Sequence, residues 1–460
     1  MNNTHTTTTT ITRQFSNFAV DMKYDDIPPD VIIAAKKGVL DFIGVALIGS
    51  GEKSTGILRQ TVVGSDKRGA ATVFGTPLMT SATKAAIVNG YAVHCLDFDD
   101  VQPISGGHMS GAVLAATLAL AESHHLSGKA LICAYVVGFE IGYRLGAVRR
   151  FGYHLRDRGV HPTGFLCHFG AAGGASNLLA LDTLHTRRSF GIVAGHASGL
   201  MRSFGTMCKG QNAGNAAQNA VLSAQLSQNG FTGPEDIFDG DGNIFAIHGA
   251  EADEAALVRD LGKRFEITNN TFKCFACAGW RNPIMEAMIA IASANKLKPA
   301  NIEKVELKVC KEVIGLPNYP QPKTGLEAKF SAQYAAAVAL ADKAGNAAQF
   351  SDQRVTDPVL AELGQKVTLE ADNTLELNQV RASVRTTDGR EFSHFVEIPK
   401  GDPRKPLDWE ELEVKFRSNA RAALTARRVN ELAATIRNLE TVSDVADLAR
   451  LCRPGSKAKP

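Results

Sequence analysis

Residues 94–108, HCLDFDDVQPISGGH, hold a group of side chains suited to acid–base chemistry. Asp97, Asp99 and Asp100 fall within four residues, and a glycine-rich turn then leads to His108, where a helical pattern opens. A histidine at a helix entrance, oriented by an aspartate, can act as a general acid or base near neutral pH. A solvated acidic loop is the alternative interpretation. The three aspartates could instead hold Mg²⁺ or Ca²⁺, but the segment lacks the Asp-x-Asp-x-Asp-Gly loop with its distal Glu, so we predict no metal.

Two further polar segments precede helical patterns. His161-Pro162-Thr163-Gly164 opens a helix of small residues, and Lys209 lies in the glycine-flanked segment 205–214, GTMCKGQNAG, which we predict to be a loop before a helix at 215–227. A helix N-terminus together with a lysine suits a carboxylate or a phosphate. The segment is not a Walker A loop, because no Gly-Lys-Ser/Thr follows the required spacer. A structural histidine and a surface loop are the alternatives.

Segment 271–283, TFKCFACAGWRNP, carries two cations, Lys273 and Arg281, at a predicted junction between domains. Ligand sites are frequent at such junctions, so both cations are candidates for binding an anionic substrate. The Cys274-x-x-Cys277 pair is weak evidence for zinc or redox chemistry, since it lacks a second ligand pair and a thioredoxin-like context.

The elements that position these residues are mostly helical. Apolar and small residues at helical spacing predict helices at 31–48, 81–92, 111–124, 131–148, 170–181, 189–203 and 214–230. Alternating patterns predict strands at 302–309, 367–369 and 375–377, and a hairpin of 380–385 with 391–398 around Asp388-Gly389. We therefore predict a mainly α fold, a large all-helical domain plus a smaller α+β lid domain. The predicted parts are a disordered lead-in at 1–14, the helical domain at 15–264 and 408–453, the lid at 265–407 and a basic tail at 454–460.

Composition excludes several classes of protein. The 460 residues are 44% hydrophobic and 21% charged, which excludes a disordered chain. Fifty basic against 47 acidic side chains leave a net charge of +3, so no nucleic-acid partner is predicted. Lys36, Lys37 and Asp41 interrupt the most apolar stretch, so no membrane span is predicted. The polar N-terminus lacks a signal-peptide core, and eight scattered cysteines indicate reduced thiols and a cytoplasmic location.

Six collinear segments resemble the MmgE/PrpD family, which includes 2-methylcitrate dehydratase, cis-aconitate decarboxylase and iminodisuccinate epimerase. They are NGYAVHCLDFDD with His108-x-Ser-Gly, HPTG at 161–164, FGTMCKGQNAGNAAQNAVLSA at 204–224, GFTGP at 230–234, FKCFAC at 272–277 and LEAKFSAQYAAAVAL at 326–340. The resemblance spans residues 30–420. It implies an all-helical domain with an α+β lid, a homodimer, and activity without a metal or an organic cofactor. By motif, it implies the catalytic residues Asp97, His108, His161, Lys209 and Lys273, with Tyr319 in PNYPQP as a further substrate-binding residue.

Three motifs depart from the family pattern. Val101 stands where Thr is common, Asn212 and Asn215 replace the His and Arg of the loop after the lysine, and Arg281-Asn282 replaces a His-Pro. We therefore predict a lyase for a small di- or tricarboxylate, with Lys209, Lys273, Arg281 and Tyr319 binding the substrate and a 2-methylcitrate dehydratase-like hydro-lyase favoured. An epimerase or a decarboxylase of a polycarboxylate is the first alternative. A non-catalytic carboxylate-binding protein is the second.

Overall fold

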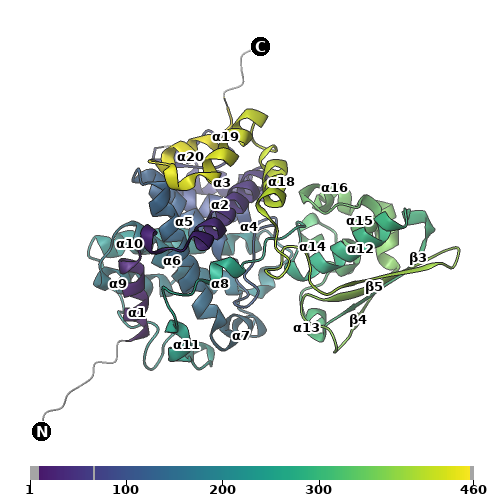
Figure 1. Ribbon diagram of the computed structural model, residues 1–460, viewed down its shortest axis with the longest axis horizontal. Coiled ribbons are helices and arrows are strands. Elements are labelled where there is room, and N and C mark those ends of the chain that lie inside the picture. The colour runs from purple at the N-terminus through teal and green to yellow at the C-terminus, as the bar shows by residue number, and fades with distance from the viewer. Residues whose placement is uncertain (1–9, 66–67, 456–460) are drawn as a thin grey trace, which may run out of the picture.

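The computed structural model describes residues 10–65 and 68–455, and they form two bodies that lie side by side (Figure 1). We call the body made of α1–α11 and α18–α20 the helical domain. We call the body made of α12–α17 and β3–β6 the α+β domain. The mainly α fold predicted from the sequence is confirmed, with the larger sheet confined to the C-terminal half of the chain.

The helical domain is built from two groups of helices. The first comprises α1 (Ile11–Asp21), α2 (Pro29–Gly49), α3 (Lys53–Val63), α4 (Ala82–His94), α5 (Met109–Ser123), α6 (Gly128–Ala147), α7 (Phe151–Asp157), α8 (Pro162–Leu178), α9 (Thr183–Ala194), α10 (Cys208–Gln228) and α11 (Glu254–Val258). The second comprises α18 (Trp409–Ala420), α19 (Ala426–Arg437) and α20 (Val445–Leu451). A small ribbon of β1 (Ala71–Thr72) and β2 (Met79–Thr80) lies between α3 and α4 in the sequence.

Helices α4, α5, α6, α8 and α10 form the centre of this domain and pack directly on one another. Small residues permit the close approach: a Cβ at Gly170 of α8 would lie 2.6 Å from the carbonyl oxygen of Gly138 in α6. Within the described residues, one stretch, Gly128–Asp157, is long and apolar enough to cross a membrane, and 94% of its most apolar window is buried by the surrounding protein.

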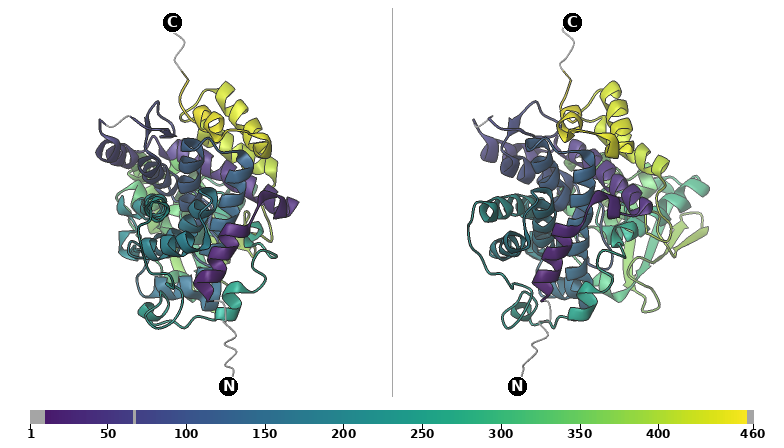
Figure 2. Two further views of the ribbon diagram at one scale, coloured as in Figure 1. Left: turned by 90° about the vertical axis from the view of Figure 1, so that its left-hand side faces the viewer. Right: turned by 60° about the vertical axis from the view of Figure 1, so that its left-hand side comes forward.

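The chain returns to the helical domain after the sheet. Helices α18 and α19 pack on α2, and α20 packs on α5, so the last helices lie against the first ones (Figures 1 and 2, yellow on purple and blue). The buried ammonium of Lys415 in α18 lies 2.7 Å from Asp41 in α2 and ties the two segments together.

The α+β domain has a four-stranded sheet in the order β4-β3-β5-β6. Strand β3 (Ile302–Val309) is parallel to β4 (Val367–Ala371) and antiparallel to β5 (Val380–Thr386), which forms a hairpin with β6 (Glu391–Val396). Gly389 adopts a φ of 86° in the hairpin turn, as the predicted Asp-Gly turn requires. The domain's helices are α12 (Asn282–Ala294), α13 (Lys311–Ile314), α14 (Gly325–Ala328), α15 (Ala332–Asp342), α16 (Asp352–Val355) and α17 (Pro358–Gln365), and α12 and α15 pack on the sheet.

Three predicted elements differ from the structure here, and a fourth, α10, is described in the next paragraph. Helix α1 begins at Ile11, inside the predicted lead-in, because Thr10 caps it and Phe15 packs on Phe238; residues 1–9 lie outside the described residues. Helix α9 begins at Thr183, because Asp182 caps it, and it ends at Ala194, so the apolar spacing at 189–203 continues into an irregular segment. Residues 375–377 form a turn after β4, since Asp372 caps a local bend there.

Helix α10 begins at Cys208, where the sequence predicted a loop up to residue 214. The glycines there serve packing on α4. A Cβ at Gly210 would lie 3.0 Å from Cα of Cys95, and one at Gly214 would lie 2.6 Å from the carbonyl oxygen of Ile87. Lys209 therefore sits in the first turn of a helix, where its side chain has a fixed direction.

Candidate active site

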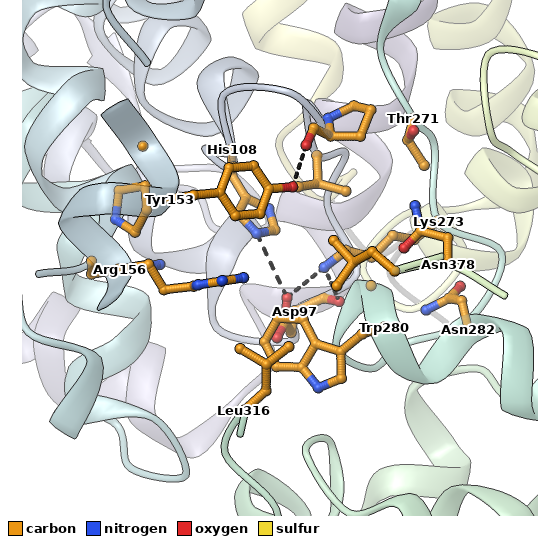
Figure 3. Close-up of a pocket in the computed structure, with 18 of the residues that line it drawn as sticks. Asp97, His108, Tyr153, Arg156, Thr271, Lys273, Trp280, Asn282, Leu316 and Asn378 are labelled. Carbon is orange, nitrogen blue, oxygen red and sulfur yellow. Dashed lines mark hydrogen bonds and ion pairs between the residues drawn. The ribbon is translucent and has the colours of Figure 1, made fainter. Parts of the chain in front are cut away.

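A cavity of about 120 Å³ lies between the two domains (Figure 3). The helical domain contributes Asp97, His108, Tyr153, Arg156, His161, Phe204 and Lys209 to its wall, and the chain from residue 271 onward contributes Lys273, Trp280, Asn282, Leu316, Asn378 and Lys400. Five of the seven predicted site residues therefore line one cavity, although they are spread over the sequence from residue 97 to residue 273.

Asp97 stands at the floor of this cavity and holds two lysines. It follows α4 in a tight turn, with a φ of 53°, and its Oδ1 lies 2.5 Å from Nζ of Lys273 and 3.2 Å from Nζ of Lys209. Lys273 also donates to the backbone carbonyl of Asp97 at 2.9 Å. All three side chains are almost completely buried. The cavity therefore contains two fixed ammonium groups that share one carboxylate.

The pKa values of this group follow from burial and pairing. Burial raises the pKa of Asp97, but Lys209 and Lys273 outweigh it, and the net pKa lies far below the ordinary value. Burial lowers the pKa of Lys273, but Asp97 and Asp99 raise it above the ordinary value. For Lys209 burial prevails, and its pKa is lowered. Lys209 is thus the more weakly compensated cation of the two.

Three histidines meet next to this group. His108 is the N-cap of α5, His161 is the N-cap of α8, and His94 ends α4. The His94 ring lies 4.6 Å from that of His108 and 5.7 Å from that of His161, centroid to centroid. The backbone N–H of His108 donates to the hydroxyl of Thr163 at 3.1 Å, which joins the two helix entrances.

Asp99 orients two of these rings. Its Oδ2 lies 2.7 Å from Nδ1 of His94 and 3.1 Å from Nδ1 of His108, the second contact being close but poorly aligned for a hydrogen bond. A carboxylate beside Nδ1 favours the tautomer with the proton there, which leaves Nε2 of His108 as a base. That Nε2 lies 4.0 Å from Oδ1 of Asp97 and faces the cavity (Figure 3).

In His161 the ring proton lies on the other nitrogen than in His108. The amide Nδ2 of Asn212 lies 2.8 Å from Nδ1 of His161 and also donates to the hydroxyl of Ser203. An amide nitrogen only donates, so Nδ1 of His161 accepts and the ring proton lies on Nε2. The site thus offers one unprotonated and one protonated imidazole nitrogen.

Burial favours the neutral form of all three rings. It lowers the pKa of His108 despite the pull of Asp99, lowers that of His94 to about 4, and lowers that of His161 well below the ordinary value, with His94 and Lys209 adding to the effect. Neutral imidazoles beside fixed ammonium groups suit proton transfer at a carbon next to a carboxylate.

Comparison with known proteins shows the family of this chain. Residues 13–254 match the model of the MmgE/PrpD N-terminal domain, and residues 275–441 match that of the C-terminal domain. The chain belongs to the MmgE/PrpD family. It is 30% identical to human cis-aconitate decarboxylase, over 96% of this chain and 94% of the relative, and 29% identical to the mouse enzyme, over 96% and 93%. Cis-aconitate decarboxylase of Aspergillus terreus is 26% identical, over 96% and 95%.

In this MmgE/PrpD protein Arg281 does not face the cavity, so its prediction as a substrate-binding residue is wrong. Its buried guanidinium donates to the carbonyl of Phe330 at 2.9 Å and to Oδ1 of Asn318 at 3.2 Å, inside the α+β domain. Burial lowers its pKa to about 10. The cation therefore connects its own segment to the segments of Asn318 and Phe330.

Tyr319 lies behind the cavity wall as well. Its hydroxyl donates to the carbonyl of Phe204 at 2.8 Å, and Phe204 separates it from the cavity. The prediction that Tyr319 binds substrate is therefore not met in this arrangement. Of the departures from the family pattern, Val101 lines the cavity and Asn212 contacts His161, whereas Asn215 is not part of the lining that the described residues form.

Two residues of the site, His94 and Arg156, were not singled out from the sequence, and Asp99 was noted there only as one of three clustered aspartates. His94 and Asp99 lie inside the HCLDFDD motif, next to the predicted site residue Asp97. Arg156 enters the cavity from α7 beside Tyr153, opposite Lys273 (Figure 3). The sequence signal for Arg156 as a site residue, a Tyr-x-x-Arg spacing on a short helix, is weak.

The alternatives with metal and redox chemistry fit the geometry poorly. His94, Asp99 and His108 bring potential metal-ligand atoms within 4.8 Å of one another. However, Nδ1 of both histidines faces the same oxygen of Asp99, and the ammonium of Lys209 lies 3.3 Å from Nδ1 of His94. Asp100 points elsewhere, to Ser110 and Asn270. Burial raises the pKa of Cys274 to about 11 and of Cys277 to about 12, which disfavours reactive thiolates.

Proposed function

We propose that this protein is a lyase that decarboxylates a small unsaturated tricarboxylate of the cis-aconitate type without a metal or an organic cofactor. The observation that carries the proposal is the convergence of two buried ammonium groups, of Lys209 and Lys273, with the neutral rings of His108 and His161 around one cavity. The relatives compared above, which align over nearly their whole length, carry the name cis-aconitate decarboxylase, and this supports the choice of substrate class.

The chemistry needs a stabilised carbanion. When the bond to the departing carboxylate breaks, its electron pair forms a new carbon–carbon double bond, the electrons of the existing double bond move to the adjacent carbon, and that carbon takes a proton. His161, with its proton on Nε2, can donate this proton, and the imidazolate that this leaves near the Lys209 ammonium regains a proton from water after product release. Lys209 and Lys273 oppose the negative charge that develops next to the remaining carboxylates.

His108 has the complementary role. Its unprotonated Nε2 faces Asp97 and the cavity, so it can accept a hydrogen bond from a protonated group of the substrate and orient that group. Asp97 pairs with both lysines and offsets one of their two positive charges, and a substrate carboxylate competes with it for the same two ammonium groups. A positioned acid–base group contributes roughly 10²–10⁴-fold to such a rate.

Dehydration uses the same kind of acid–base pair, and the hydro-lyase favoured from the sequence stays a prediction. The names of the relatives favour a carboxy-lyase over it. The test is to incubate the full chain with cis-aconitate and to measure CO₂ release and the product by proton NMR, with citrate and 2-methylcitrate followed by ultraviolet absorbance for new double bonds. CO₂ from cis-aconitate alone supports the proposal. A new unsaturated product from a hydroxy acid without CO₂ would replace it with a hydro-lyase, and binding without any turnover would favour the non-catalytic alternative.

A further inference from the structure

A second, wider cleft lies beside the catalytic cavity. Its volume is about 960 Å³, and it runs between η2 (Val148–Arg150), α7 and η3 (Met201–Ser203) of the helical domain and the segment 312–319 of the α+β domain. We call it the outer cleft. Five residues belong to the walls of both spaces: Tyr153, Arg156, Met201, Phe204 and Leu316. A molecule in the outer cleft is therefore one layer of side chains away from the catalytic cavity.

The outer cleft is rich in positive charge. Its lining includes the arginines Arg149, Arg150, Arg156 and Arg202, against two carboxylates, Asp157 and Glu312. The guanidinium of Arg150 lies 3.9 Å from Glu312, which belongs to the opposite domain, and Arg149 pairs at 3.0 Å with Glu251. Arg156 pairs with its neighbour Asp157 at 3.1 Å, yet its side chain is only 16% exposed and reaches the shared wall.

The backbone that carries two of these arginines is strained. Arg149 has a φ of 44° and a ψ of 30°, and Arg150 has a φ of 57° and a ψ of 36°, a left-handed conformation that glycine and asparagine adopt most easily. Their side chains are 56% and 63% exposed, so core packing does not require them there. Consecutive arginines in such a conformation at a cleft are the kind of strain that accompanies a binding role.

The arginines are also ordered. The ring of Tyr153 lies 4.6 Å from the guanidinium carbon of Arg150 and 4.7 Å from that of Arg156, and its hydroxyl donates to the carbonyl of Pro103. This aromatic ring holds one guanidinium at the outer cleft and the other at the wall of the catalytic cavity. Planar guanidinium groups bind carboxylates through two parallel hydrogen bonds.

We propose that the outer cleft is an anion-capturing entrance for the polycarboxylate substrate, with Arg156 as the residue that binds its carboxylate at the passage to the catalytic cavity. The inference rests on the proposed function for the nature of the anion. Charged residues of one sign between two protein walls raise the local concentration of the opposite ion and its rate of association, and salt screens the effect. Glu312 opposes this field from within the cleft.

The test is the salt dependence of kcat/KM with cis-aconitate for the wild type, the double variant Arg150→Gln/Arg202→Gln, Glu312→Gln and the control Arg427→Gln. Arg427 is an 87% exposed arginine that also pairs with a glutamate, Glu431, on α19. At low salt we expect the double variant to lose roughly three- to tenfold in kcat/KM with little change in kcat, and Glu312→Gln to gain. The control should match the wild type, and the differences should vanish at about 0.5 M NaCl, where the Debye length is only a few ångströms.

The opposite signs for Arg150 and Glu312 separate capture of an anion from a structural latch. If the ion pair between these residues only held the domains together, both substitutions would lower kcat/KM alike, and this outcome would overturn the proposal. If the wild type does not turn over cis-aconitate, the proposed function fails on its own. The outer cleft is then tested by calorimetric binding of the saturated analogue tricarballylate at low and high salt in the same variants. Weaker binding in the double variant with tighter binding in Glu312→Gln supports capture, and no binding or equal affinities would overturn it.

Discussion

Asn212 holds Nδ1 of His161 at 2.8 Å, and the same two helices repeat this contact two turns further on, where Nδ2 of Asn219 lies 3.2 Å from Nε2 of His168. The first contact lies at the catalytic cavity and the second is partly buried between α8 and α10. Two chemically matched contacts on one helix pair allow a functional role of Asn212 to be separated from a packing role.

Asn212→Ala removes the donor that keeps the proton of His161 on Nε2. We expect kcat to fall by about tenfold or more with a small change in KM, because the proton donor then populates the wrong tautomer. Asn219→Ala should lower the melting temperature without this loss of kcat. Steady-state kinetics and thermal unfolding of the two variants check the prediction, and equal kcat losses in both would contradict it.

His108→Ala should lower kcat by about 10²-fold or more, because it removes an acid–base group from the reaction. Since burial lowers the pKa of His108 below its ordinary value of 6.5, the acidic limb of the pH profile of kcat/KM should also lie below pH 6.5. His125, which is 70% exposed and pairs with Asp444, provides the control His125→Ala. Turnover of His108→Ala close to that of the wild type would remove the assignment of the whole site.

Lys209→Ala should raise KM by about tenfold or more, because a charge-assisted hydrogen bond to a substrate carboxylate is lost. Lys209→Arg should rescue it poorly, since the ammonium sits in a tight space between Asp97 and His94 that a planar fork does not fit. Lys415→Ala breaks another buried lysine–aspartate pair, with Asp41, and should lower stability while KM stays constant. A KM for Lys209→Ala equal to that of the Lys415 control is the result that would count against a binding role.

Asp100 provides a pH test of stability. Burial raises its pKa from 3.8 to about 7, with Asp41 adding to the effect, so the folded protein keeps a proton there that the unfolded chain loses. This group therefore lowers the free energy of unfolding as pH rises from about 4 to 7, by at most about 1.4 kcal/mol per pH unit, and its effect is constant above that range. Relative to the wild type, Asp100→Asn should become progressively more stable over this window in urea unfolding.

Asp342 supplies a control of opposite sign for that experiment. Burial raises the pKa of Asp342, but Arg354 outweighs it and the net pKa is lowered, so its contribution to stability is present above the unfolded pKa and is lost as pH falls. Asp342→Asn should therefore lose stability relative to the wild type as pH rises. A parallel response of the two variants would show that the pKa of Asp100 is not raised.

Treatment with EDTA should leave both activity and melting temperature unchanged. Oδ2 of Asp99 faces Nδ1 of both His94 and His108, and the buried ammonium of Lys209 lies beside His94. Activity that EDTA abolishes and that Mg²⁺ or Zn²⁺ restores would disprove the metal-independent assignment.

Local sequence patterns suffice for much of the fold and for the identity of most candidate residues. The helix at Pro29–Gly49 follows from its proline start and apolar spacing, and the hairpin around Asp388-Gly389 follows from a turn that needs a positive φ. His108 and His161 are recognisable because each stands at a helix entrance, a position that the following residues specify locally. These features depend on interactions within a few residues along the chain.

The tertiary structure decided which of these residues meet. Gly210 and Gly214 look like loop residues until α4 packs against them, and only this packing makes Lys209 part of a helix aimed at Asp97. Arg281 and Lys273 are equally plausible cations in one segment, yet one is held by carbonyls of the α+β domain and the other pairs with Asp97, 176 residues away. The sequence by itself determined the helices, the hairpin and the chemistry available, whereas the pairing of side chains depended on long-range packing, which no local spacing encodes.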